Sequence, residues 1–225
     1  MSYKKTVLMD KTNRIRKTIE ILKKSNKQSM LGSFSELGPW KILIATILSA
    51  RAKDETTIPV SKELFRRYPD AESLAYAEKK DIEELIRKIG FYKNKTKYII
   101  ETSRIIHEDY GGSVPDRIDE LLKLPGVGRK VANCELVYAF RKPAIPVDTH
   151  VHRISNRLGW VKTKTPGQTE KELLKIVPND IWIDVNEHLV TLGREICRPI
   201  GPKHEACPIS KYCEFYRNLH KQANQ

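Results

Sequence analysis

Three cysteines and one histidine are concentrated in residues 197–213, CRPIGPKHEACPISKYC, and their chemistry is the easiest in the chain to name. Cys197, His204, Cys207 and Cys213 follow the spacing C-x6-H-x2-C-x5-C. Thiolates and imidazole bind soft and borderline metals, and these four donors can form a tetrahedral zinc site. Chance alone does not explain cysteines at this density. The segment therefore predicts a metal site with a structural role.

A second stretch with chemical potential is LPGVGRKVA, residues 124–132. Gly126 and Gly128 permit a tight turn whose main-chain amides are not covered by side chains. Such a turn at the start of a helix binds anions, because the amides and the helix dipole both point at the incoming charge. Arg129 and Lys130 follow at once in the sequence. We therefore predict a contact with phosphate here, the alternative being a plain turn between two helices.

The charge balance of the chain indicates a polyanionic partner. Its 225 residues include 41 Lys and Arg against 28 Asp and Glu, a formal net charge of +13. Such a surface attracts nucleic acid, although charge alone favours a merely soluble basic protein equally well. The longest apolar run, ILIATILSA at 42–50, is too short to cross a bilayer, and the first residues contain no signal peptide. We therefore expect a cytoplasmic or nuclear protein with no membrane partner.

This compartment bears on the cysteines. Disulfides are rare where the surroundings are reducing, so clustered cysteines favour a metal over a crosslink. The fourth cysteine, Cys134, lies far from the others in the sequence. It is predicted to be a small buried residue.

The elements that must position these residues are helices. Apolar residues recur at helical spacing along almost the whole chain, and no run alternates like a strand. The segment WKILIATILSA is apolar on nearly every side, which is typical of a helix surrounded by other helices. The pattern therefore predicts an all-α protein of two compact lobes, with this segment at the centre of a bundle. Later helices are predicted at residues 116–122, 129–140, 150–158, 168–176 and 181–197.

Three motifs in order carry a family resemblance: LPGVGRKVA, then VDTHVHR at residues 147–153, then the cysteine segment. From about residue 12 to residue 216 the chain resembles the helix-hairpin-helix DNA glycosylases, specifically their endonuclease III branch. The resemblance implies two helical domains with a DNA-binding groove between them. The implied domains are a central one at 31–144, which holds the hairpin, and a discontinuous terminal one at 1–30 plus 145–225, which carries the metal loop.

By this resemblance Lys130 matches the catalytic lysine and Asp148 the catalytic aspartate of the bifunctional enzymes. Cleavage of an N-glycosidic bond builds positive charge on the sugar, which a carboxylate stabilises, while an uncharged amine can attack C1′. Loss of a proton from C2′ of the resulting Schiff base then permits β-elimination. The alternatives are that Lys130 only contacts phosphate and that Asp148 only caps a helix starting near Thr149.

The resemblance implies DNA contacts at the hairpin residues Gly126, Gly128 and Arg129. It also implies DNA contacts in two other loops. A base inside the duplex must leave the stack before its bond can be cut, and a side chain must fill the gap. The family places the filling residues in loops that match SARAKD and IGFYKNK, which identifies Arg51 and Phe91. Glutamine is usual at the first place, so Arg51 is a departure that can change which opposite base is tolerated. Phe91 can instead be an ordinary core aromatic.

The family pattern for the metal loop is C-x6-C-x2-C-x5-C, which ligates a [4Fe-4S] cluster. In this chain His204 occupies the second place, with Cys197, Cys207 and Cys213 at the others. Histidine replaces cysteine as a ligand in some clusters and tends to raise the reduction potential. The retained spacing favours the cluster. Zinc, or a cluster on three cysteines with His204 turned aside, are the alternatives.

Together these features predict a base-excision repair enzyme that removes oxidised or damaged pyrimidines, such as thymine glycol, and cleaves the strand as an AP lyase. Its partner would be double-stranded DNA with a damaged base or abasic site, bound by a monomer, in the nucleoid of a prokaryote or the nucleus of a eukaryote. One alternative is a glycosylase for mismatched thymine or uracil. Another is a non-catalytic helix-hairpin-helix protein that only binds DNA.

Overall fold

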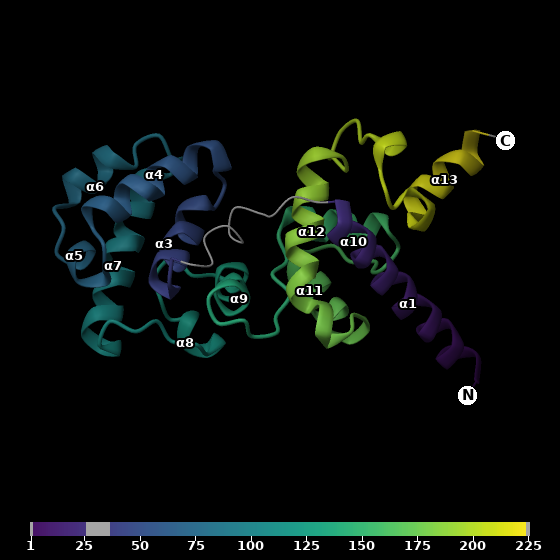
Figure 1. Cartoon of the computed structure of the whole chain (residues 1–225), viewed down its shortest axis with the longest axis horizontal. Coiled ribbons are helices and arrows are strands. Elements are labelled where there is room, and N and C mark those ends of the chain that lie inside the picture. The colour runs from purple at the N-terminus through teal and green to yellow at the C-terminus, as the bar shows by residue number, and fades with distance from the viewer. Residues whose placement is uncertain (1, 26–36, 224–225) are drawn as a thin grey trace. The chain divides into compact units, whose positions relative to one another are not determined.

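The computed structural model describes residues 2–25 and 37–223, with side chains for residues 11–25 and 37–219. Within these ranges the chain forms α-helices, short 3-10 turns and loops but no strand, which confirms the all-α prediction. The chain divides into two compact units (Figure 1). The central unit is Met30–Lys142, and the terminal unit combines Met1–Ser29 with Pro143–Gln225.

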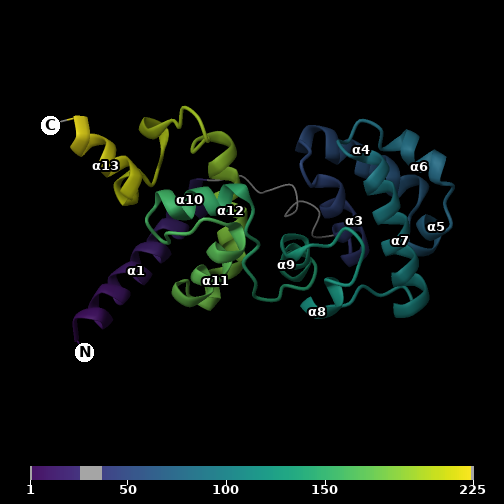
Figure 2. The same ribbon diagram turned by 180° about the vertical axis from the view of Figure 1, so that it is seen from behind.

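Helix α3 (Pro39–Ser49) lies at the centre of the central unit. Proline at its first position suits a helix start, and the eight residues from Trp40 to Leu48 other than Lys41 are buried. It packs against α4 (Asp54–Arg67), α7 (Tyr92–Tyr110) and α9 (Arg129–Tyr138), as Figures 1 and 2 show from opposite sides. The predicted place of this apolar segment inside a bundle is therefore confirmed.

Short helices complete the central unit: α5 (Ala71–Ala75), α6 (Lys79–Leu85) and α8 (Ile118–Leu121). Both α5 and α6 pack on α7, and α8 packs on α9. Cys134 on α9 is completely buried, as predicted. The hairpin between α8 and α9 thus lies on helices that pack together, while Gly126 and Gly128 within it are exposed.

The terminal unit joins the two ends of the chain in one core. Ile15, Ile19 and Leu22 on one face of α1 (Ser2–Ser25) are completely buried among residues of the later helices. Those helices are α10 (Thr149–Arg157), α11 (Pro166–Ile176), α12 (Trp182–Glu195) and α13 (Glu214–Ala223). The five predicted helices after residue 115 begin and end within two residues of their observed bounds.

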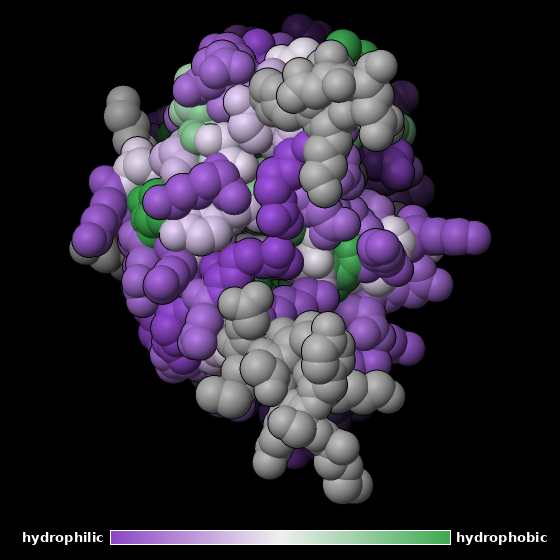
Figure 3. Space-filling model, turned by 90° about the vertical axis from the view of Figure 1, so that its right-hand side faces the viewer, coloured by the Kyte–Doolittle hydropathy of each residue, from purple (hydrophilic) through white to green (hydrophobic). Residues whose placement is uncertain are grey.

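The described part of one face of the terminal unit is mostly polar (Figure 3). Figure 3 views it from the side that carries α1 and α13, and mostly hydrophilic side chains cover that face. None of the helices in the described ranges combines the length and apolar character that a membrane span requires.

Glu135 is a carboxyl group inside the core of the central unit. It lies on α9, its side chain is completely buried, and neither carboxyl oxygen has a hydrogen-bond partner among the residues that the structure describes. Burial raises the pKa of Glu135 to about 9, so the group is protonated at neutral pH. A buried polar group without a hydrogen bond costs about 1–3 kcal/mol. Glu135 therefore destabilises the fold.

Replacing Glu135 with methionine, which has a similar length, is expected to raise the free energy of unfolding by about 1–3 kcal/mol near pH 5 and by more at pH 7, where the wild type also keeps a proton that its unfolded chain has released. Each kcal/mol corresponds to a rise in Tm of about 2–4 °C for a chain of this size. The folded state keeps a proton that the unfolded chain releases above a pKa of 4.5. The free energy of unfolding of the wild type should therefore fall as the pH rises from about 4.5 to about 9, because over this range the unfolded chain has released the proton and the folded chain still holds it.

Thermal unfolding followed by circular dichroism between pH 5 and pH 9 measures both effects, within the range that the Glu135 pKa of about 9 defines. Glu135→Gln is the control, since it keeps a polar side chain but cannot titrate. It should remove the pH dependence with a smaller gain in Tm. Parallel Tm profiles for all three proteins would mean that Glu135 is not a buried neutral acid.

Candidate active site and metal centre

The hairpin between α8 and α9 is packed against α7. Gly126 has a φ of 76°, a conformation that side chains rarely adopt, and a Cβ there would lie 2.8 Å from the Tyr98 side chain. The Thr102 hydroxyl donates to the Pro125 carbonyl at 2.8 Å. The turn is therefore held in one shape, and only glycine fits at position 126.

Gly128 is the N-cap of α9 and has an ordinary φ of −86°. A Cβ at this position would meet nothing within 4 Å, so glycine is not required by the fold here. Within the described part of the chain, no side chain caps the first turn of α9. Arg129 is exposed and Lys130 is half-buried in that turn. This arrangement presents main-chain amides and two cations to an approaching anion.

Asp148 is the N-cap of α10 in the terminal unit. Its Oδ1 accepts hydrogen bonds from the amides of His150 and Val151, both at 2.8 Å. The capping role considered from the sequence is therefore real. Both bonds use Oδ1, so the cap does not occupy Oδ2. The cap fixes the half-buried carboxylate in position, and capping does not preclude a chemical role.

Two arginines on α10 hold the start of the metal loop, residues 197–213. Arg153 donates to the Cys197 carbonyl at 2.8 Å. Arg157 donates to the Cys197 sulfur at 3.3 Å and to the Arg198 carbonyl at 2.7 Å. Our sequence reasoning missed both arginines, although their spacing of four residues places them on one helix face.

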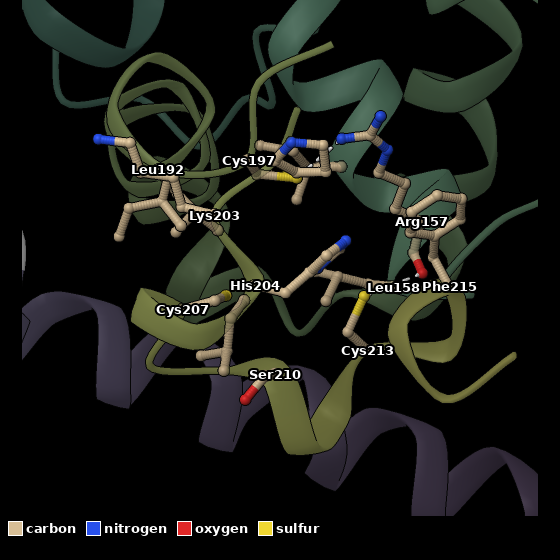
Figure 4. A pocket seen from close by; sticks show the side chains of 14 residues that line it. Arg157, Leu158, Leu192, Cys197, Lys203, His204, Cys207, Ser210, Cys213 and Phe215 are labelled. Carbon is tan, nitrogen blue, oxygen red and sulfur yellow. Dashed lines mark hydrogen bonds between the residues drawn. The ribbon is translucent and has the colours of Figure 1, made fainter. Parts of the chain in front are cut away.

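The four predicted metal donors line one cavity. Cys197 follows α12, Cys213 directly precedes α13, and His204 and Cys207 lie between them. Figure 4 shows all four side chains around this cavity, with His204 directed into it. Burial raises the pKa of the Cys207 and Cys213 thiols, so a metal that binds them must displace their protons.

The orientation of His204 comes from aromatic contacts. Its ring centroid lies 5.1 Å from that of Tyr216 and 5.9 Å from that of Phe215, both on α13. The described side chains include no group of three His, Cys, Asp or Glu residues that converges closely enough for a single metal ion.

In the central unit the structure brings Arg51 and Phe91 together. The Arg51 guanidinium lies 5.7 Å from the centroid of the Phe91 ring, and both side chains are exposed, Phe91 by 62%. The interpretation of Phe91 as a core aromatic is therefore wrong. Each residue has a positive φ, 55° for Arg51 and 61° for Phe91, which costs conformational energy.

Sequence reasoning also missed Lys95, which lies on α7 one turn after Phe91 and is 5% exposed. A signal existed in the spacing. Lys95, Ile99, Thr102 and Ile106 recur at intervals of four, three and four residues along the buried face of α7. A lysine in that register occupies a core position.

The chain is similar to known base-excision DNA repair proteins. Residues 44–179 match the family model described as HhH-GPD superfamily base excision DNA repair protein. The chain is 52% identical to endonuclease III of Thermotoga maritima, over 83% of this chain and 87% of the relative. A trapped endonuclease III–DNA covalent intermediate is 33% identical with a TM-score of 0.81, covering 93% of this chain and 98% of that one. A thermostable thymine-DNA glycosylase has the same TM-score and coverage at 27% identity.

The helix-hairpin-helix with a lysine in the first turn of α9, in a chain whose described residues form helices and no strand, together with the family match identifies the class as base-excision DNA repair proteins. The chain belongs to the HhH-GPD superfamily of these proteins and, within it, to the endonuclease III family. The predicted fold and the predicted enzyme class, a bifunctional DNA glycosylase and AP lyase, are thereby confirmed.

Proposed function

We propose that the enzyme removes oxidised pyrimidines from duplex DNA and that Lys130 and Asp148 perform the chemistry. The observation that supports this proposal most strongly is the position of Lys130, which is half-buried in the first turn of α9 directly after the hairpin. A relative of the same fold has been trapped as a covalent intermediate with DNA, which requires such a nucleophile. An enzyme of this kind acts where the cell keeps its DNA, in the nucleoid or nucleus.

In the proposed mechanism the uncharged Lys130 amine attacks C1′ of the extruded nucleotide, and the N-glycosidic bond breaks. The bond electrons leave with the base, which takes up a proton. The attacking nitrogen then releases one proton, and its lone pair forms the C1′–N double bond of the protonated imine while the C1′–O4′ bond breaks and O4′ takes up a proton. Removal of the C2′ proton then expels the 3′ phosphate. The Asp148 carboxylate stabilises the positive charge that develops on the sugar.

The residues proposed to contact DNA are exposed. The hairpin glycines and Arg129 bind a backbone phosphate, because the first-turn amides of α9 have no side-chain cap. Arg51 and Phe91 fill the gap left by the extruded nucleotide. Their exposure and mutual contact support this role, since a stacked pair can replace a base in the helix.

The metal loop is proposed to hold a [4Fe-4S] cluster through Cys197, His204, Cys207 and Cys213. The donor set fits: three thiols and an imidazole line one cavity together with apolar side chains. The retained spacing of the four donors favours the cluster over one zinc ion. A bound cluster would join the four donors and so hold the loop closed, while Arg153 and Arg157 hold the start of the loop on α10.

Elemental analysis tests the cluster. Protein purified without air should be brown, with about four iron and about four sulfide ions per chain. Cys213→Ser should lose both the iron and the colour, whereas Cys134→Ala, which alters a cysteine outside the loop, should keep them. His204→Cys should retain the cluster and lower its reduction potential, because thiolate donates more charge than imidazole. A colourless protein with about one zinc ion would contradict the assignment.

Removal of mismatched thymine is the second candidate, because a thymine-DNA glycosylase shares this fold at 27% identity. One panel of duplexes separates the two. The substrates carry thymine glycol, dihydrouracil, uracil opposite guanine, thymine opposite guanine, or a preformed abasic site. We expect excision of the oxidised pyrimidines and nicking at the abasic site, with borohydride trapping of both. Cleavage confined to the mismatches would favour the second candidate, and binding without cleavage would contradict both.

A further inference from the structure

A buried cation near the proposed DNA-filling residues has no role in the chemistry above. The Lys95 ammonium donates to the Leu48 carbonyl at 2.8 Å and to the Ala50 carbonyl at 2.6 Å. No acidic side chain among the described residues forms an ion pair with it. Burial lowers the pKa of Lys95 to about 8, which reflects the cost of keeping a charge in the core. The negative end of the α3 dipole offsets part of that cost.

The contacts of Lys95 join two loops that are distant in sequence. Ala50 is the C-cap of α3 and immediately precedes Arg51. On the other side, the Lys95 main-chain amide donates to the Phe91 carbonyl at 3.0 Å in the first turn of α7. The loops are also close elsewhere, since a Cβ on Gly90 would lie 3.7 Å from the Arg51 carbonyl oxygen. One residue thus contacts both loops.

We propose that Lys95 is a positioning residue that clamps the loop of Arg51 to the loop of Phe91, so that both side chains enter the DNA stack as one preorganised pair. The inference rests on the proposed DNA contacts of these two residues. Both have strained positive φ angles and exposed side chains, and without a clamp such residues relax to other conformations. A rigid pair avoids the entropic cost of ordering two loops when the base is extruded.

Lys95→Met tests the clamp. Methionine fills similar space but cannot donate, and the relief of a buried charge offsets part of the lost hydrogen bonds. Thermal unfolding checks the fold, and Lys95→Gln replaces this variant throughout if Lys95→Met does not fold. The first readout is the fluorescence of a purine analogue opposite a non-cleavable abasic site, which reports insertion into the stack. The second compares base excision from duplex with nicking at an abasic site in single-stranded DNA.

We expect the fluorescence change on binding to fall at least about threefold and duplex excision to fall about tenfold, since preorganisation is lost. Nicking of single-stranded DNA should stay within about twofold of wild type, because no stacked neighbour must be replaced there. A merely structural role would instead lower both activities together. An equal loss in duplex and single strand would therefore overturn the proposal.

A mutant cycle adds a sharper criterion. In a protein that already carries Arg51→Ala and Phe91→Ala, adding Lys95→Met should reduce duplex excision by no more than about twofold, since the clamp has nothing left to position. A further tenfold loss would overturn the clamp. If the wild-type protein gives the fluorescence change of insertion but excises none of the damaged bases, the proposed function is refuted. The clamp is then still supported, because insertion itself is measured.

Discussion

Lys130→Ala is expected to abolish borohydride trapping and to reduce strand cleavage by about a thousandfold or more, because no other group in the mechanism forms the Schiff base. Alanine is the best helix former, so the first turn of α9 should persist. DNA binding should also persist and weaken as salt rises, since the phosphate contacts remain. Trapping, single-turnover cleavage and binding at two salt concentrations measure these three outcomes.

Arg129→Ala is the matched control for this variant. Arg129 is the neighbouring cation in the same helical turn and is exposed. Its loss should weaken binding and flatten the salt dependence while leaving the covalent adduct in place at saturating enzyme. If the Lys130 variant still nicks DNA at the wild-type rate, the amine is not the nucleophile and the mechanism is wrong.

Asp148→Asn is expected to reduce excision of damaged bases by about a hundredfold or more, because a neutral amide cannot stabilise the cationic sugar. Asparagine is as good an N-cap as aspartate, so the two hydrogen bonds to Oδ1 should survive. The Tm should therefore stay close to that of wild type. Single-turnover excision and thermal unfolding, measured on the same preparation, separate charge from capping.

Asp148→Ala completes this comparison. It removes both the charge and the cap, so it should lose the same activity and also about 1 kcal/mol of stability. Full excision activity in the asparagine variant would show that Asp148 serves only as the cap of α10.

Short segments of the sequence were sufficient to predict many features of this protein's structure. The apolar run of α3 predicted a buried helix, because side chains that are apolar on every face must be covered by others. The hairpin was predicted from its glycines, and Gly126 does take the positive φ that the turn requires. The spacing of the four metal donors predicted one loop, and they do line one cavity.

Some residues could not be assigned by local signals. The sequence allowed Phe91 to be either a DNA-filling residue or a core aromatic. Its side chain is 62% exposed because Phe91 is the N-cap of α7, at a place that the other helices of the central unit do not cover. Glu135 carries no warning in sequence that its carboxyl group would be enclosed without a partner. Burial depends on what the other helices cover, and that is decided by contacts between distant segments.

The sequence by itself determined the class of fold, the family and the order of motifs, and it predicted the donors of the metal loop, because these are properties of short segments and their spacing. Only the tertiary structure decided that Arg51 and Phe91 meet, and that the Lys95 ammonium reaches two carbonyls more than forty residues away in the chain. The physical reason is that a side chain is buried only when several helices cover it together, and the apolar periodicity of one helix does not say which helices these are. Periodicity specifies only which face of that helix turns inward.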